Sequence, residues 1–137
     1  MEAPGQRLTF LFADVEGSTR ITEQHGADAG VALARYHELV ATTSERHDGR
    51  IFERIGDGAY ATFPDAMRAV SAADEIQQRI GAEDWGAIGR LRVRVALASG
   101  DVEQRDERFF GVALVRAARL EGLASGGETL LAGSTVD

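Results

Sequence analysis

The sequence contains no cysteine, no lysine and no long apolar run. The absence of cysteine excludes disulfide bonds and thiolate metal sites, and it favours a cytoplasmic protein. No stretch approaches the ~20 apolar residues of a membrane span, and the first residues lack the apolar segment of a signal peptide, so we expect no membrane partner. All 15 basic residues are arginine, so any step that needs a positive side chain must use a guanidinium.

What remains is the composition of an ordinary soluble domain. Of the 137 residues, 44% are hydrophobic and 27% are charged, which is enough to build one domain around a core. The net charge of −7 argues against a nucleic-acid partner, whereas a nucleotide site with a divalent cation tolerates it. Residues 134–137 resemble the start of another helix. We therefore expect residues 1–137 to form a single domain, the N-terminal fragment of a longer protein.

Hydrophobic periodicity predicts an alternation of strands and helices. The predicted elements are a strand at 8–15, a helical region at 17–47 interrupted near Gly26 and Gly30, strands at 50–55 and 59–63, a helix at 65–81, a strand at 91–98, a polar strand or flap at 101–109 reaching toward a partner, a helix at 111–123 and a strand at 128–131. This order predicts an α+β fold with a ferredoxin-like split βαβ core (βαββαβ) and an αβ extension.

Two of these elements carry explicit predictions about which side is buried. The helix at 65–81 is expected to turn five residues inward, namely Met67, Val70, Ala73, Ile76 and Ile80. The strand at 91–98 alternates apolar and basic residues, which predicts a half-exposed strand with Arg92 and Arg94 on its solvent face.

Two aspartates are the strongest candidates for chemistry. Asp14 ends the first predicted strand, and Asp57 lies between glycines in the turn that joins the second and third. Each alone is best explained as a turn residue, but neighbouring strands would bring the pair together. Carboxylates paired in this way can hold Mg²⁺ or Mn²⁺ against phosphates. The Gly17-Ser18-Thr19 turn opens a helix, and is equally typical of a phosphate site and of a simple helix cap.

Other polar residues give weaker signals. Arg119 follows small residues on a predicted helix, where an arginine can approach a phosphoryl group, although a solvated helix face is the commoner reason for such a residue. Arg116 is interpreted as solvated. The three histidines, His25, His37 and His47, have no metal-ligand spacing.

Taken together, four motifs resemble the catalytic domain of class III adenylate/guanylate cyclases, especially bacterial members with a D-x-E-G-S-T start. The motifs are Phe12-Ala13-Asp14-Val15-Glu16-Gly17-Ser18-Thr19, Ile55-Gly56-Asp57-Gly58, Leu97-Ala98-Ser99-Gly100-Asp101, and Phe110-Gly111 through Arg116-Ala117-Ala118-Arg119-Leu120. The resemblance covers nearly the whole chain, in the family's order and spacing.

This resemblance implies an activity and a set of site residues. The family converts ATP or GTP into a cyclic 3′,5′-nucleotide and pyrophosphate for intracellular signalling, as a head-to-tail homodimer with Mg²⁺ or Mn²⁺. The implied metal positions are Asp14, Val15 and Asp57, and the implied phosphate-binding positions are Glu16, Gly17, Ser18 and Thr19. Arg119 matches the arginine that the partner subunit supplies to the transition state.

Three positions depart from the family pattern. Glu53 stands where the family has a purine-reading lysine, Arg108 where it has an aspartate, and Val115 where it has a ribose-orienting asparagine. Glu53 suits guanine better than adenine, so GTP is favoured over ATP if a base is bound. Alternatively, Glu53 and Arg108 pair across the dimer interface and fill the base pocket.

The departures leave more than one function open. Loss of a ribose contact at Val115 predicts a rate loss of roughly 10–100-fold or more, so the sequence predicts a weak or inactive cyclase. The alternative is a non-catalytic nucleotide-sensing or dimerisation module that regulates downstream domains. A nucleotide hydrolase or cyclic-dinucleotide synthase on the same plan is disfavoured, because the G-G-D-E-F turn of the synthases is absent.

Overall fold

The structure, a computed structural model, describes residues 6–133, so the predicted helix start at 134–137 lies outside the described residues. Its elements are β1 (Gln6–Val15), α1 (Ser18–His25), α2 (Ala27–Arg46), β2 (Arg50–Ile55), β3 (Gly58–Phe63), α3 (Ala66–Ala82), a 3₁₀ turn (Gly86–Ile88), β4 (Val93–Arg105), β5 (Arg108–Phe110), α4 (Val112–Leu123) and β6 (Thr129–Leu131). Most predicted elements are present within a few residues of their predicted bounds, but the predicted strands at 91–98 and 101–109 form one continuous strand, β4, followed by the short β5.

The sheet has the strand order of a split βαβ fold. Strand β1 lies between β3 and β4 and runs antiparallel to both, β2 pairs with the outer side of β3, and β6 pairs parallel to β4. The end of β4 forms a hairpin with β5. The predicted ferredoxin-like core with an αβ extension is therefore confirmed.

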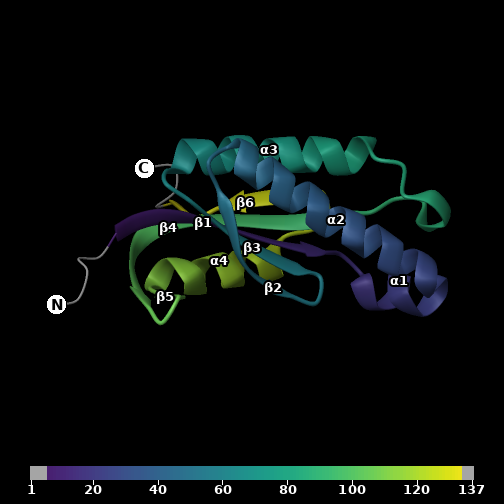
Figure 1. The fold of residues 1–137 in the computed structure, drawn as a ribbon, viewed down its shortest axis with the longest axis horizontal. Coiled ribbons are helices and arrows are strands. Elements are labelled where there is room, and N and C mark those ends of the chain that lie inside the picture. Colours follow the sequence, from purple (N-terminus) through teal and green to yellow (C-terminus); the bar gives the residue numbers. More distant parts are fainter. Residues whose placement is uncertain (1–5, 134–137) are drawn as a thin grey trace.

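Helices cover both faces of this sheet (Figure 1). Helices α2 and α3 lie on one face and α4 on the other, while α1 lies beyond the end of the sheet. The larger core, between the sheet and α2 and α3, contains fully buried Tyr36, Leu39 and Ile76. A smaller core under α4 contains Phe10 and Phe12. Burying one such large apolar side chain contributes about 1.5–3 kcal/mol, so both layers stabilise the sheet.

The buried face of α3 differs from the prediction. Ala73, Ile76 and Ile80 are buried as expected, but Met67 is 80% exposed and Val70 is 41% exposed. The buried stripe instead continues toward the N-terminus through alanines, at Ala72 and Ala69. Alanine allows a helix backbone to approach a sheet closely, so small residues face the core where the periodicity alone favoured large ones.

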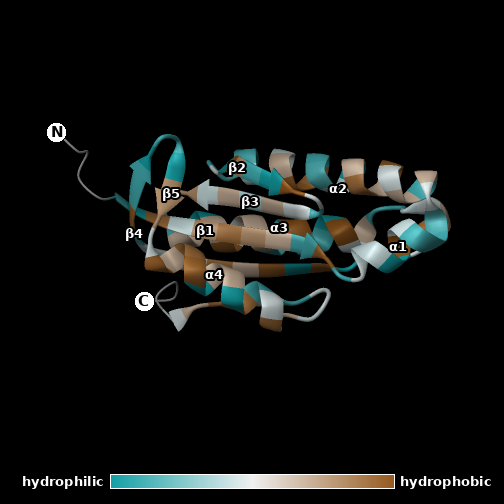
Figure 2. Ribbon diagram, turned by 90° about the horizontal axis from the view of Figure 1, so that it is seen from below, coloured by the Kyte–Doolittle hydropathy of each residue, from teal (hydrophilic) through white to brown (hydrophobic). Residues whose placement is uncertain are grey.

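Strand β4 is more buried than its alternation suggested. Ala96 and Ala98, which alternate with the apolar residues of the other face, are fully buried because α4 covers that side. Figure 2 views the molecule from this side, with α4 lying over the sheet and β1 and β3 largely apolar. The prediction of a half-exposed strand is therefore wrong for this part of β4. Within residues 6–133, no helix combines the length and the apolar character needed to cross a bilayer.

Candidate functional site

The pairing of β1 with β3 brings the two candidate aspartates to one end of the sheet. Ala13 lies opposite Ala59, so the end of β1 adjoins the turn between β2 and β3. The backbone N–H of Val15 donates a hydrogen bond to Oδ2 of Asp57 at 3.0 Å. Asp57 is therefore attached to the residue that directly follows Asp14, which is the arrangement that the motif order predicted.

Arg94 forms the main contact of Asp14. The two residues lie opposite each other in the antiparallel pair of β1 and β4. Nε of Arg94 donates to Oδ1 of Asp14 at 2.7 Å and Nη2 donates to Oδ2 at 2.5 Å. The side chains are only 29% and 15% exposed, respectively. Arg92 is exposed as predicted, but the prediction that Arg94 belongs to a solvent face is wrong, because its partner strand presents a carboxylate at the same position.

The turn that carries Asp57 is held from helix α2. Nε2 of His37 lies 2.9 Å from the carbonyl oxygen of Gly56. A carbonyl only accepts, so Nε2 carries the proton of this bond. Gly56 has a φ of 57°, a left-handed conformation that glycine adopts without strain. The neighbouring Tyr36 is buried, and burial together with the charges of Asp57 and Asp14 raises the pKa of its hydroxyl well above the ordinary value.

A third carboxylate faces this site from α4. Glu121 has a pKa raised to about 7, mainly by burial and then by the negative charge of Asp14, while the positive charge of Arg94 lowers it. Tyr60 on β3 responds to the same charges, since burial, Glu121 and Asp14 raise the pKa of its hydroxyl. Both shifts favour the neutral form of the group, and the negative charge of Asp14 contributes to each, while Arg94 opposes the shift of Glu121.

The predicted phosphate turn lies beside these aspartates. Gly17 has a φ of 68° and precedes Ser18, the first residue of α1, but no side chain caps the helix. Gly17 is the N-cap residue of α1, as a simple helix cap requires, and its role as a phosphate site stays a prediction. The carboxylate of Glu16 accepts from the backbone of Gly126 at 3.1 Å, so it faces that loop.

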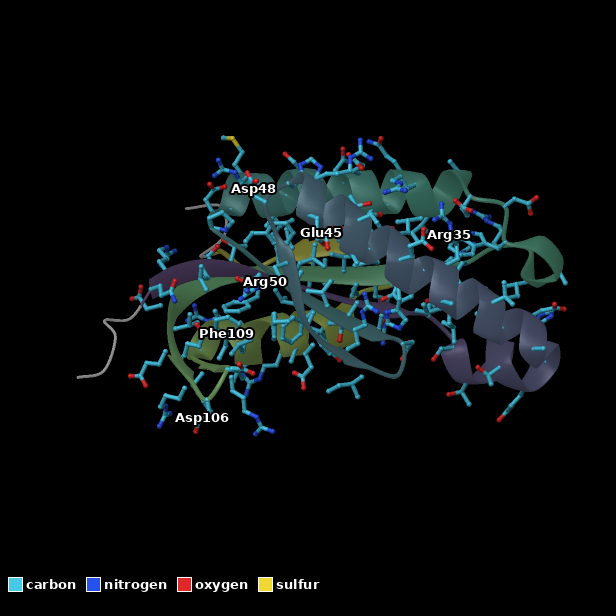
Figure 3. All side chains as sticks on the ribbon, in the orientation of Figure 1. Arg35, Glu45, Asp48, Arg50, Asp106 and Phe109 are labelled. Atoms are coloured by element: carbon cyan, nitrogen blue, oxygen red, sulfur yellow. The ribbon has the colours of Figure 1, made fainter. Side chains whose placement is uncertain are left out.

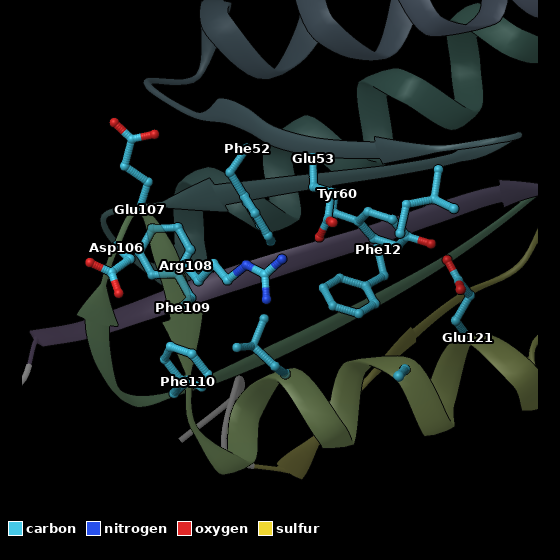
Figure 4. A pocket seen from close by; sticks show the side chains of 13 residues that line it. Phe12, Phe52, Glu53, Tyr60, Asp106, Glu107, Arg108, Phe109, Phe110 and Glu121 are labelled. Carbon is cyan, nitrogen blue, oxygen red and sulfur yellow. The ribbon is translucent and has the colours of Figure 1, made fainter.

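The base-reading positions line a pocket of about 730 Å³ on the α4 side of the sheet (Figure 4). Glu53 enters it from β2 and Arg108 from β5, and the guanidinium of Arg108 points into it. Aromatic rings form much of its wall, namely Phe12, Phe52, Tyr60, Phe109 and Phe110. Both charged residues belong to one chain, so contact between them does not require a second copy. In the described part of the chain they form no ion pair with each other.

Helix α4 presents the remaining candidates outward. Val115 is 54% exposed, and Arg119 and Arg116 are also exposed. Arg119 forms no ion pair within residues 6–133. The structure of one chain thus gathers the metal positions at one end of the sheet and leaves the arginine position on the surface.

The donors at Asp14 and Asp57 suit a hard divalent cation. Carboxylate oxygens are the ligands that Mg²⁺ and Mn²⁺ prefer, and the guanidinium bound to both oxygens of Asp14 shows that this position accepts positive charge. Among the described residues, no group of three or more acidic or histidine side chains has metal-site geometry. A cation here would therefore rely on few protein ligands and on substrate oxygens, as Mg²⁺ sites commonly do.

Sequence reasoning missed Arg94, His37 and Glu121. The predicted topology made strands 8–15 and 91–98 neighbours, which indicated that Arg94 could lie near Asp14. Periodicity does not give the strand register that places Arg94 opposite Asp14. His37 and Glu121 lie on helices, and their positions depend on how those helices pack against the sheet.

Comparisons with known proteins agree with this fold. No protein-family model matches the sequence. The chain is 34% identical over 121 residues to a putative adenylate cyclase of Rhizobium meliloti, covering 86% of this chain and 21% of that protein. It is 32% identical over 136 residues to an uncharacterized protein of Mycobacterium tuberculosis, covering 98% of this chain and 45% of that protein. The chain thus spans less than half the length of these curated relatives.

Solved structures give the same result. The adenylate/guanylate cyclase/hydrolase of Silicibacter pomeroyi superposes with a TM-score of 0.83 at 30% identity, covering 94% of this chain and 77% of that chain. A monomeric adenylate cyclase of Trypanosoma brucei has a TM-score of 0.90 at 22% identity, covering 99% of this chain and 76% of that chain. The chain belongs to the class III adenylate/guanylate cyclase catalytic domain family.

Proposed function

We propose that this domain binds a nucleoside triphosphate with Mg²⁺ or Mn²⁺ and is a cyclase of weak or no activity. The observation that carries the proposal is the hydrogen bond between Val15 N–H and Asp57 Oδ2, because it fixes the two aspartates at one end of the sheet. Bound at Asp14 and Asp57, a divalent cation would activate the ribose hydroxyl and offset phosphate charge. The N-terminus of α1 beside them supports a phosphate site.

The reaction proposed is an in-line displacement. The ribose 3′-oxygen forms a bond to the α-phosphorus, the bond from that phosphorus to the bridging oxygen breaks, and pyrophosphate leaves. Arg119 is exposed and forms no ion pair within the described residues, so it is available to a second copy. We propose a head-to-tail homodimer in which Arg119 of that copy meets the charge developing on the phosphoryl group.

The base and ribose end is where activity would be lost. Glu53 and Arg108 line the pocket together, and Glu53 can accept hydrogen bonds from guanine but cannot donate to adenine N1. If a base is read, GTP is therefore preferred over ATP. Val115 cannot hydrogen-bond a ribose hydroxyl, so the reacting oxygen would be poorly oriented.

A second candidate function follows from these same residues. If Glu53 and Arg108 pair across the dimer interface, they would fill the base pocket, and the domain would act as a nucleotide-sensing or dimerisation module without turnover. The inward direction of the Arg108 guanidinium favours this alternative.

One assay separates the two functions. The purified protein is incubated with Mn²⁺ and GTP or ATP, and cyclic product is measured by mass spectrometry. Product above the level of an Asp57→Ala control, with more from GTP than from ATP, supports the enzyme. Nucleotide binding without product supports a nucleotide-sensing module, and absence of both product and calorimetric nucleotide binding supports a dimerisation module.

Restoring the family residues tests the diagnosis. The triple variant Glu53→Lys, Arg108→Asp, Val115→Asn should raise ATP turnover by at least about 10-fold, because it returns both the base contacts and the ribose contact. A triple variant that folds and dimerises but makes no more cyclic AMP than the parent would show that the defect lies elsewhere.

A further inference from the structure

Arg94 holds the position beside Asp14 that a cation would need. Its two hydrogen bonds, at 2.7 and 2.5 Å, engage both carboxylate oxygens of Asp14. Such a bidentate, charge-assisted contact is among the strongest polar interactions in proteins. A divalent ion and the guanidinium would compete for the same two oxygens, so Arg94 must leave Asp14 before an ion can be bound there fully.

A second carboxylate, that of Glu121, acts electrostatically on both Arg94 and Asp14. Glu121 projects from α4 at the end of the pocket remote from the β4–β5 hairpin (Figure 4). Its Oε2 atom is buried and has no protein hydrogen-bond partner among the described residues. Glu121 and Arg94 already affect each other, since the negative charge of Glu121 raises the pKa of Arg94. An unpaired buried carboxylate oxygen is costly, and a guanidinium would satisfy it.

We propose that Arg94 is a positioning residue that exchanges Asp14 for Glu121 when a divalent cation binds. Without the ion, Arg94 neutralises Asp14 and leaves Glu121 unpaired. With the ion bound at Asp14 and Asp57, Arg94 pairs with Glu121. The three carboxylates and one guanidinium then balance the two charges of the ion. This inference rests on the proposed function, because it takes Asp14 and Asp57 as the ligands of the ion.

The exchange predicts how the two residues set cation affinity. Arg94→Gln removes the competitor and should tighten Mn²⁺ binding about tenfold, as loss of one strong ion pair would. Glu121→Gln removes the alternative partner and should weaken it by roughly threefold to tenfold. In the Arg94→Gln background, Glu121→Gln should change Mn²⁺ affinity little, because the variant has no guanidinium that Glu121 could pair with.

Manganese binding is measured from the electron paramagnetic resonance signal of free Mn²⁺, without nucleotide. The pH is held at about 8, above the pKa of about 7 for Glu121, so that this carboxyl is ionised. Arg92→Gln serves as the matched control, because Arg92 is an exposed arginine two residues before Arg94, and it should leave affinity unchanged beyond about twofold. Arg94→Lys keeps the positive charge but cannot form the bidentate contact with Asp14. It replaces Arg94→Gln if that variant does not fold.

The outcomes separate this inference from the proposed function. If the effects of Arg94→Gln and Glu121→Gln on the dissociation constant simply multiply, the site responds to net charge alone and the exchange is wrong. Weaker binding in Arg94→Gln would also overturn it. If no variant binds Mn²⁺, or if Asp14→Asn and Asp57→Asn bind as well as the parent, the metal site of the proposed function is itself wrong.

Discussion

Glu121 is the residue whose ionisation is most altered by the fold. Burial raises its pKa from 4.5 to about 7, and Asp14 adds to this effect. The folded state therefore binds a proton more tightly than the unfolded chain does. Because the folded state binds this proton more tightly, the free energy of unfolding falls as the pH rises from about 4.5 through about 7.

Glu121→Gln should remove this pH dependence. Because the side chain is partly exposed, we reduce the effect expected from the shift to about 1–2 kcal/mol. Urea unfolding should then find the variant more stable than the parent by that amount at about pH 8, and nearly equal to it at about pH 4.5. Glu23→Gln, an exposed substitution on α1, is the control. Plots of its free energy of unfolding and that of the parent against pH should be parallel. Parallel curves for Glu121→Gln as well would refute the assignment.

At this scale the sequence predicted only part of the site. The convergence of Asp14 and Asp57 followed from motif order and topology. Arg94 did not, because a strand register sets which residues face each other, and alternation is compatible with many registers. Met67 was predicted to be buried because periodicity favours large apolar residues on the buried face. The pattern does not indicate that alanines bring α3 close to the sheet, which leaves Met67 exposed.

Among the elements, the β4–β5 hairpin forms one wall of the pocket that Glu53 and Arg108 line. Its two central residues, Asp106 and Glu107, have φ values of 51° and 65°. Two left-handed residues are typical of the tightest hairpin turns, which usually carry glycine or asparagine. Figure 3 shows Asp106 at the tip, away from the layer of α2 and α3. On the returning strand, Phe110 contacts the guanidinium of Arg105, whose carbon lies 4.4 Å from the ring centroid.

Glu107→Gly should therefore stabilise the hairpin. Glycine adopts a left-handed conformation without steric cost, so we expect a gain of about 0.5–1 kcal/mol. Thermal unfolding monitored by circular dichroism would measure it, with Glu107→Ala as the matched control, since alanine keeps the Cβ atom and gains nothing. A glycine variant no more stable than the alanine variant would show that the turn carries no strain.

Most elements were predictable from sequence to within a few residues, except that β4 continues to Arg105 and joins two predicted strands. Strong signals at their ends account for this, such as Gly26, which has a φ of 50° and separates α1 from α2. The predicted interruption near Gly30 is wrong. Gly30 lies inside α2 and is not among the glycines with a positive φ. The polar segment at 101–109 was predicted as a strand or flap, and its strand character is confirmed, while its contact with a partner stays a prediction.

For the whole molecule, the order of the elements leaves the proposed metal positions and the proposed transition-state arginine on different elements of one chain. The metal positions and the start of α1 lie at one end of the sheet, whereas Arg119 is exposed on α4. Within residues 6–133, Arg119 forms no ion pair with Asp14 or Asp57. This separation is the physical reason to propose a head-to-tail homodimer.

The most direct test of the account is an anomalous diffraction experiment on crystals soaked with Mn²⁺ and a non-hydrolysable GTP analogue. We predict a manganese peak bridging Asp14 and Asp57, the triphosphate against the start of α1, and the Arg94 guanidinium moved from Asp14 to Glu121. Crystals in which the nucleotide is bound, the Asp14–Arg94 pair is intact and no manganese peak lies between the two aspartates would contradict it.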